Sequence, residues 1–213
     1  MATTLNALSY DPPGGSGDWL LVALHGWGAN AADLFGLAGY LNLPGFKMRF
    51  PDAPFPHPQV PGGRMWYGFP YTYDFRSPPN FQDQADLQES RRLLRTWMES
   101  LEASTGIPLN RTVMAGFSQG GAMTLDVGTD LPLAGQIILS GYLHGALPPS
   151  PPPRSVMIVH GKHDPVVPVE LAHQTQSRLQ EIGLAPKYIE ISMGHEIPPE
   201  VIGQIVGFCE DLG

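Results

Sequence analysis

The sequence predicts an α/β protein in which a mostly parallel, twisted β-sheet carries helices on both faces. Short, continuous apolar segments alternate with longer amphipathic ones over most of the 213 residues, as in parallel strands joined by crossover helices. Hydrophobic residues make up 42% of the chain and charged residues 15%, which excludes a disordered chain and a coiled coil. We expect a single domain, residues 1–213, because this length provides one buried core.

The predicted core begins after a turn-rich N-terminal edge segment, residues 1–17, which has room for at most a short edge hairpin. Six apolar segments are the predicted strands: residues 19–24, 47–50, 112–116, 135–139, 155–160 and 187–191. Five amphipathic segments are the predicted helices: residues 31–41, 82–104, 120–128, 169–182 and 199–212.

A long loop, residues 51–81, interrupts this alternation and is rich in proline and aromatic side chains. Irregular segments of this length are uncommon in a compact domain, and those that occur often carry function. The loop is expected to face a substrate or to cover an exposed edge of the sheet, and the two roles are compatible.

Charge and motif content exclude several classes of partner. The net charge of -8, without a basic cluster, argues against nucleic acid and anionic membranes. No apolar run approaches the ~20 residues that span a bilayer, so stable membrane insertion is not expected. No dinucleotide-binding or phosphate-loop motif occurs, so no nucleotide cofactor is expected. The single cysteine, Cys209, and the absence of a signal-peptide pattern predict a cytoplasmic protein; the oligomeric state is left open.

The segment from Thr112 to Met123 contains the pattern Gly-x-Ser-x-Gly, with Ser118 between Gly116 and Gly120. It lies between a predicted strand and a predicted helix. A serine at such a turn sits in a strained backbone conformation, and the glycines let the strand and the helix pack closely. The start of the helix directs N–H groups and its positive dipole end at the same point. Ser118 is therefore the predicted nucleophile.

A serine nucleophile needs a histidine to accept its proton and an acid to orient that histidine. In folds with this turn, the chain order is serine, acid, histidine. Asp164 directly follows an apolar strand, whereas Asp126 and Asp130 belong to the helix after Ser118 or to its end. His195 follows the last predicted strand. Since sites assemble at the carboxyl ends of parallel strands, Asp164 and His195 are the predicted partners of Ser118.

The first strong strand runs into His25-Gly-Trp-Gly. This turn can supply a second oxyanion donor, the backbone N–H of Trp27, beside that of Gln119, the residue after the nucleophile. The indole of Trp27 is then free to line an acyl pocket. An alternative use of His160, His163 and Asp164 as metal ligands lacks a second cluster to complete a zinc shell, so no metal is expected.

These motifs resemble the phospholipase/carboxylesterase family of the α/β-hydrolase superfamily, which includes bacterial carboxylesterases and acyl-protein thioesterases. The resemblance runs from about Trp19 to the last helix. Six blocks carry it: His25-Gly-Trp-Gly, Pro51-Asp-Ala-Pro, Gly116-Phe-Ser-Gln-Gly-Gly-Ala-Met, Leu139-Ser-Gly, His160-Gly-Lys-His-Asp-Pro-Val-Val-Pro and Gly194-His-Glu. It implies an α/β-hydrolase fold with the same triad and the same two oxyanion donors.

The resemblance also implies that Trp27, Trp66 and Tyr67 face the substrate. The chain departs from the family at these places, because the family more often has Leu at the position of Trp27 and Asp at the position of Gly68. These departures leave the chemistry unchanged and the substrate open.

The predicted function is hydrolysis of carboxylic esters through an acyl-enzyme on Ser118, without a cofactor. Small-molecule or lipid acyl esters and thioesters are the expected substrates. One alternative is acyl-protein thioesterase or lysophospholipase activity on longer acyl chains. Another is a catalytically silent scaffold that binds an apolar ligand through residues 51–81, against which the complete triad argues. Acyl length, leaving group and the choice of ester or thioester depend on the shape of the loops.

Overall fold

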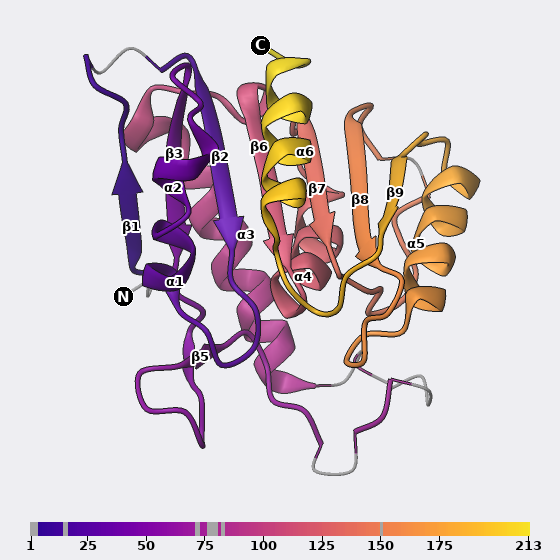
Figure 1. Ribbon diagram of the computed structural model, residues 1–213. Coiled ribbons are helices and arrows are strands. Elements are labelled where there is room, and N and C mark those ends of the chain that lie inside the picture. The colour runs from indigo at the N-terminus through magenta and orange to yellow at the C-terminus, as the bar shows by residue number, and fades with distance from the viewer. Residues whose placement is uncertain (1–3, 15–16, 71–72, 76–80, 82–83, 150) are drawn as a thin grey trace.

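The computed structural model describes residues 4–14, 17–70, 73–75, 81, 84–149 and 151–213. Seven strands form one sheet in the order β1-β3-β2-β6-β7-β8-β9 (Figure 1). Their bounds are β1 Ala7–Tyr10, β2 Trp19–Leu24, β3 Phe46–Pro51, β6 Thr112–Phe117, β7 Gly135–Leu139, β8 Ser155–Gly161 and β9 Lys187–Ile191. All neighbours are parallel except β1, which pairs antiparallel with β3 at the edge. The predicted mostly parallel sheet is confirmed.

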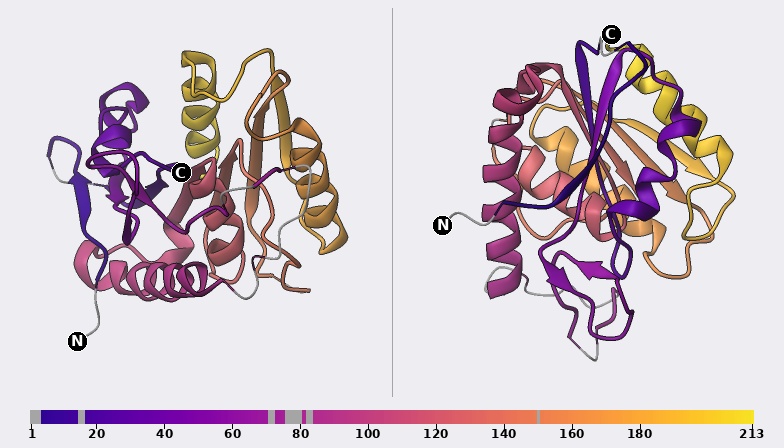
Figure 2. Two further views of the ribbon diagram at one scale, coloured as in Figure 1. Left: turned by 90° about the horizontal axis from the view of Figure 1, so that it is seen from below. Right: turned by 90° about the vertical axis from the view of Figure 1, so that its left-hand side faces the viewer.

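Helices cover both faces of the sheet (Figure 2). On one face lie α1 (Ala31–Phe35), α2 (Ala38–Leu41) and α6 (Pro199–Glu210), and on the other α3 (Ala85–Thr105), α4 (Gln119–Gly128) and α5 (Val169–Glu181). Strand β2 shows why the central strands read as continuous apolar runs. Leu20 and Val22 pack in the cluster beneath α3 and α4, whereas Leu21 packs in the cluster beneath α1, α2 and α6, as alternation in a doubly covered strand requires.

The single helix expected over residues 31–41 is wrong. The chain forms two short helices there, because the Gly36 N–H bonds to the carbonyl of Leu34 as well as that of Ala32, and the Leu37 N–H also bonds to Leu34. The two hydrogen bonds to Leu34 span two and three residues, shorter than the four of an α-helix, so they tighten the helix end and redirect the chain. Asn30 fixes the start of α1 with a capping box completed by Asp33.

Two further local features complete the comparison with the sequence prediction. The N-terminal edge segment contributes the single edge strand β1, which is within the expected limit of at most a short hairpin. Within the long loop, β4 (Phe55–Pro56) and β5 (Arg64–Met65) form a small antiparallel sheet, whereas the sequence predicts no strand there.

The parallel strands run downward in Figure 1, so their carboxyl ends meet the loops at one edge of the sheet, where β5 also lies. The turns that follow β2, β6, β8 and β9 are therefore brought to the same edge. None of the helices in the described part of the chain is long and apolar enough to cross a membrane.

Candidate active site

Ser118 occupies the sharp turn between β6 and α4, with φ of 55° and ψ of -117°. Such a conformation costs a non-glycine residue on the order of 1–3 kcal/mol, so the surrounding packing must hold it. The flanking glycines explain how it is held. A Cβ on Gly116 would lie 2.2 Å from the Gly120 carbonyl oxygen, and a Cβ on Gly120 would lie 2.3 Å from that of Leu24. No larger residue fits at either position.

The three predicted triad residues come together at the carboxyl edge of the sheet. His195 Nε2 lies 2.9 Å from Ser118 Oγ, and His195 Nδ1 lies 2.7 Å from Asp164 Oδ2. The serine follows β6, the aspartate follows β8 and the histidine follows β9. The ring of Phe117 packs against the imidazole of His195, with centroids 4.7 Å apart. The histidine is thus held on three sides.

The carboxylate of Asp164 is fully buried and fully hydrogen-bonded. Its Oδ1 accepts the backbone N–H groups of Val166 and Val167, each at 2.8 Å. Burial alone would raise the pKa of Asp164, but the hydrogen bonds from His195 and from the two backbone N–H groups lower it below its ordinary value. The ionised carboxylate therefore accepts from Nδ1–H, which leaves the Nε2 lone pair facing the serine hydroxyl.

His160 stabilises the loop that carries Asp164. It is fully buried, and its Nε2–H donates to the carbonyl of Val167 at 2.8 Å. Burial lowers the pKa of His160, so it packs beside Asp164 as a neutral ring. Over the described residues, no three His, Cys, Asp or Glu side chains converge as metal ligands would.

Two backbone N–H groups are candidates for an oxyanion hole, those of Trp27 and Gln119. Among the described residues neither finds an acceptor. The turn of Trp27 lies directly against the nucleophile, because a Cβ on Gly26 would come within 3.4 Å of the Ser118 Cβ. His25 braces this turn: its Nδ1–H bonds to the Gly26 carbonyl at 2.8 Å, and its Nε2 accepts the N–H of Ala53 at 3.0 Å.

An aromatic cleft opens beside these groups. It has a volume of about 470 Å³ and is lined by Trp27, Pro58, Gln59, Phe69, Pro70, Tyr73, Phe75 and Val166. Trp27 contributes a side of the cleft with 43% of its surface exposed. The cleft therefore extends from the oxyanion turn to the loop that carries Asp164, and most of its side chains are apolar.

Comparison with known proteins places this geometry in a family. The sequence model described as phospholipase/carboxylesterase matches residues 12–212. The chain belongs to the phospholipase/carboxylesterase family. The α/β-hydrolase fold and the hydrolase class predicted from the sequence are confirmed with it.

Individual members of the phospholipase/carboxylesterase family resemble the chain at moderate identity. Acyl-protein thioesterase 1 of Neurospora crassa is 35% identical over 141 residues, which cover 61% of this chain and 57% of that protein. Acyl-protein thioesterase 1 of Yarrowia lipolytica is 32% identical over 173 residues, covering 75% and 69%. The crystal structure of esterase PE8 superposes with a TM-score of 0.89 at 25% identity, covering 99% of this chain and 100% of that one.

Trp66 and Tyr67 do not lie where the family resemblance implied. Both side chains are fully buried, so the prediction that they contact the substrate is wrong for this conformation. Instead, both residues make hydrogen bonds to residues of the candidate oxyanion hole or its turn. The indole of Trp66 donates to the carbonyl of His25 at 3.0 Å, which ties the loop to the oxyanion turn. Of the three predicted substrate-binding residues, Trp27 alone lines the cleft.

The side chain of Gln119 is a site feature that sequence reasoning missed. Its Oε1 accepts the backbone N–H of Trp66 at 2.8 Å, and its Nε2 donates to the backbone carbonyl of Tyr67 at 2.7 Å. The side chain of a predicted oxyanion residue thus clamps the backbone of the aromatic loop. A buried amide after a nucleophilic serine carries no sequence signal that identifies its partner, because the loop lies more than 50 residues earlier in the chain.

Proposed function

We propose that the protein is a serine carboxylesterase that works through an acyl-enzyme on Ser118. The observation that carries the proposal is the unbroken chain of hydrogen bonds from Ser118 Oγ through His195 to Asp164. An alcohol is a poor nucleophile near neutral pH, and an imidazole held in the correct tautomer removes its proton as it attacks.

In the first half of the reaction, Ser118 Oγ bonds to the carbonyl carbon of the ester, and its proton passes to His195 Nε2. The carbonyl oxygen becomes an oxyanion, to which the backbone N–H groups of Trp27 and Gln119 can donate hydrogen bonds at the positive end of α4. His195 then gives the proton to the leaving oxygen as the carbon–oxygen bond breaks. Asp164 stays ionised and stabilises the imidazolium.

In the second half, water takes the place of the serine hydroxyl. It loses a proton to His195 Nε2 as it attacks the acyl carbon, and the proton returns to Ser118 Oγ when the acid leaves. No cofactor takes part in either half. The aromatic cleft beside Trp27 suits an apolar acyl group of medium length, which would bury surface against Phe69, Tyr73 and Phe75.

Thioester hydrolysis is a second candidate, favoured by the naming of the curated relatives as acyl-protein thioesterases. The same groups perform it, with a sulfur leaving atom in place of oxygen. The cytoplasmic location expected from the single cysteine belongs to the same proposal.

The test is a chain-length series of p-nitrophenyl esters and acyl-thioesters, from acetyl to palmitoyl, measured beside the Ser118→Ala variant. Turnover should peak at medium chain length and fall by roughly six orders of magnitude in Ser118→Ala if the triad acts as a unit. Ser177→Ala, a serine exchanged on the outer helix α5, is the matched control and should keep the full rate. Activity of Ser118→Ala within about tenfold of the parent would overturn the mechanism.

A further inference from the structure

A second chain of aspartate, histidine and hydroxyl lies behind the cleft. His144, in the segment after β7, has Nδ1 2.7 Å from Asp126 Oδ2 of α4 and Nε2 2.6 Å from the hydroxyl of Tyr67. The Tyr67 hydroxyl also lies 2.6 Å from that of Tyr142. The order of groups matches Asp164, His195 and Ser118, but a buried tyrosine takes the place of the serine.

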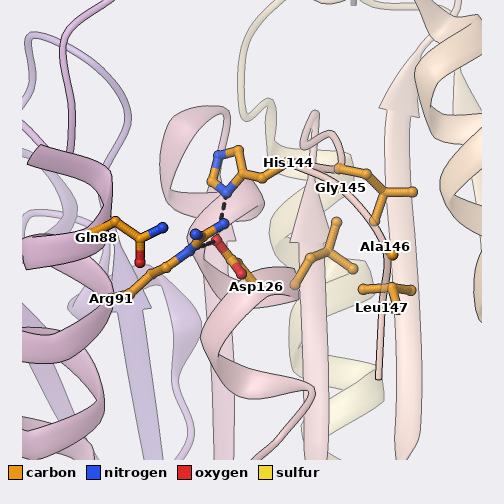
Figure 3. A pocket seen from close by; sticks show the side chains of 9 residues that line it. Gln88, Arg91, Asp126, His144, Gly145, Ala146 and Leu147 are labelled. Atoms are coloured by element: carbon orange, nitrogen blue, oxygen red, sulfur yellow. Dashed lines mark hydrogen bonds and ion pairs between the residues drawn. The ribbon is translucent and has the colours of Figure 1, made fainter. Parts of the chain in front are cut away.

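At its outer end, this series of hydrogen bonds meets an ion pair between Arg91 and Asp126, and both side chains line a cavity of about 510 Å³ (Figure 3). Arg91 of α3 reaches across to Asp126, with its Nε 2.5 Å from Oδ2. The Asp126 and Arg91 side chains are partly exposed, whereas that of His144 is 1% exposed. Solvent therefore reaches the ion pair but not the imidazole.

The charge states of Asp126, His144 and the two tyrosines determine which group donates in each of these hydrogen bonds. Burial would raise the pKa of Asp126, but the hydrogen bonds from His144 and Arg91 lower it, so the carboxylate is ionised. Burial lowers the pKa of His144 and raises the pKa of Tyr67 and of Tyr142. The neutral imidazole then donates from Nδ1 to Asp126 and accepts the Tyr67 hydroxyl hydrogen at Nε2, and Tyr67 accepts from Tyr142.

Tyr67 connects this chain to both parts of the candidate active site. Its backbone carbonyl accepts from the side chain of Gln119, whose own N–H is an oxyanion candidate. Its ring packs edge-on against Phe69, with centroids 5.5 Å apart, and Phe69 packs against Trp27 at the same distance. His144 thus holds the hydroxyl of Tyr67. The backbone of Tyr67 contacts the side chain of Gln119, and its ring contacts Phe69 in the wall of the cleft.

We propose that Asp126 and His144 are positioning residues for the esterase reaction: by holding the hydroxyl of Tyr67 they fix Gln119 in the oxyanion hole and set the width of the aromatic cleft. The inference rests on the proposed function. Neither residue touches the reacting atoms. A buried polar chain whose members all have partners allows one arrangement, since any shift leaves a donor or acceptor unpaired.

The experiment compares Tyr67→Phe, His144→Leu and His144→Gln with the parent on p-nitrophenyl acetate and octanoate. Tyr67→Phe and His144→Leu should lower kcat on acetate about tenfold with little change in KM, because the oxyanion hole acts only in the transition state. They should also weaken the preference for octanoate. His144→Gln should stay within about threefold of the parent, because its amide offers an adjacent donor and acceptor.

Tyr188→Phe is the matched control, since it removes one tyrosine hydroxyl bonded to Glu190 on β9 and should leave both substrates unaffected. The melting temperature of each variant is measured alongside. A lowered melting temperature with kcat and acyl preference within about twofold of the parent would mean that the hydrogen bonds among Asp126, His144 and Tyr67 are only structural. That result would overturn the inference.

Equal losses in His144→Gln and His144→Leu would also overturn it, since the hydrogen bonds would then not be the cause. If His144→Leu does not fold, Tyr67→Phe against His144→Gln decides by the same criteria. The parent rate separates the two proposals: an inactive parent contradicts the esterase function, whereas an active parent with unaffected variants contradicts the positioning role alone.

Discussion

Exchange of Asp164 for Asn tests the tautomer on which the mechanism depends. The amide oxygen can still accept from the N–H groups of Val166 and Val167, so the NH₂ group must turn toward His195 Nδ1. Nδ1 then becomes the acceptor, the ring hydrogen moves to Nε2, and Nε2 points a donor at Ser118 Oγ. A ring in that state cannot take the serine proton. By comparison with the same change in serine proteases, kcat should fall about 10⁴-fold, or about 5.5 kcal/mol in activation free energy.

The assay is the steady-state hydrolysis of p-nitrophenyl butyrate, together with urea unfolding of the same samples. Asp164→Ala is the informative companion, because it leaves the N–H of the fully buried Val167 without its acceptor. Loss of this acceptor should make the unfolding free energy of Asp164→Ala about 1–3 kcal/mol lower than that of Asp164→Asn, which retains the acceptor. If Asp164→Asn retains kcat within about tenfold of the parent, the orienting role assigned to Asp164 is wrong.

Three further predictions concern the turn, the cleft and pH. Gly120→Ala should destabilise the fold by about 3 kcal/mol in urea unfolding, since its Cβ would meet the Leu24 carbonyl at 2.3 Å. The control is Gly203→Ala in α6, where a Cβ has open space, and it should stabilise the fold by up to about 1 kcal/mol. Equal effects of the two exchanges would refute the packing argument. Trp27→Ala should raise KM about tenfold for p-nitrophenyl octanoate and little for acetate, in keeping with the loss of about 1.4 kcal/mol of apolar contact; equal changes in both KM values would exclude Trp27 from the acyl site. Burial lowers the pKa of three histidines, His25, His144 and His160. The unfolded chain therefore binds protons below pH ~6.5 that the folded chain does not. The unfolding free energy should be greatest above that pH and fall on acidification beneath it; equal urea midpoints at pH 7.5 and 5.5 would contradict this.

The elements that the sequence predicts well are those with strictly local causes. A run such as Trp19–Leu24 must form a strand covered on both faces, and β2, β7 and β9 have the bounds expected. The site follows from the same local signals, because the chain order of serine, acid and histidine at strand ends selects Ser118, Asp164 and His195 without knowledge of the distances. Parallel strands then bring these ends together.

The features that the sequence does not predict depend on hydrogen-bond geometry or on contacts between distant segments. Periodicity over residues 31–41 is the same for one helix or two, and the hydrogen bonds to Leu34 decide between them. An aromatic residue in a proline-rich loop is apolar whether it lines a cleft or is buried beneath it, so the sequence does not show that Trp66 and Tyr67 are buried. The pairing of Asp126 with His144 likewise arises only when α4 packs beside the segment after β7.

The most direct test of the account is the site of covalent modification by a fluorophosphonate, followed by intact mass and peptide mapping. The account predicts one adduct per chain, on Ser118, and none on the Ser118→Ala variant. It also predicts that Asp164→Asn reacts far more slowly than the parent, because phosphonylation needs the same deprotonated hydroxyl. An adduct on another residue, or an unmodified parent after prolonged exposure, would contradict the claim that Ser118, His195 and Asp164 act as one nucleophilic unit.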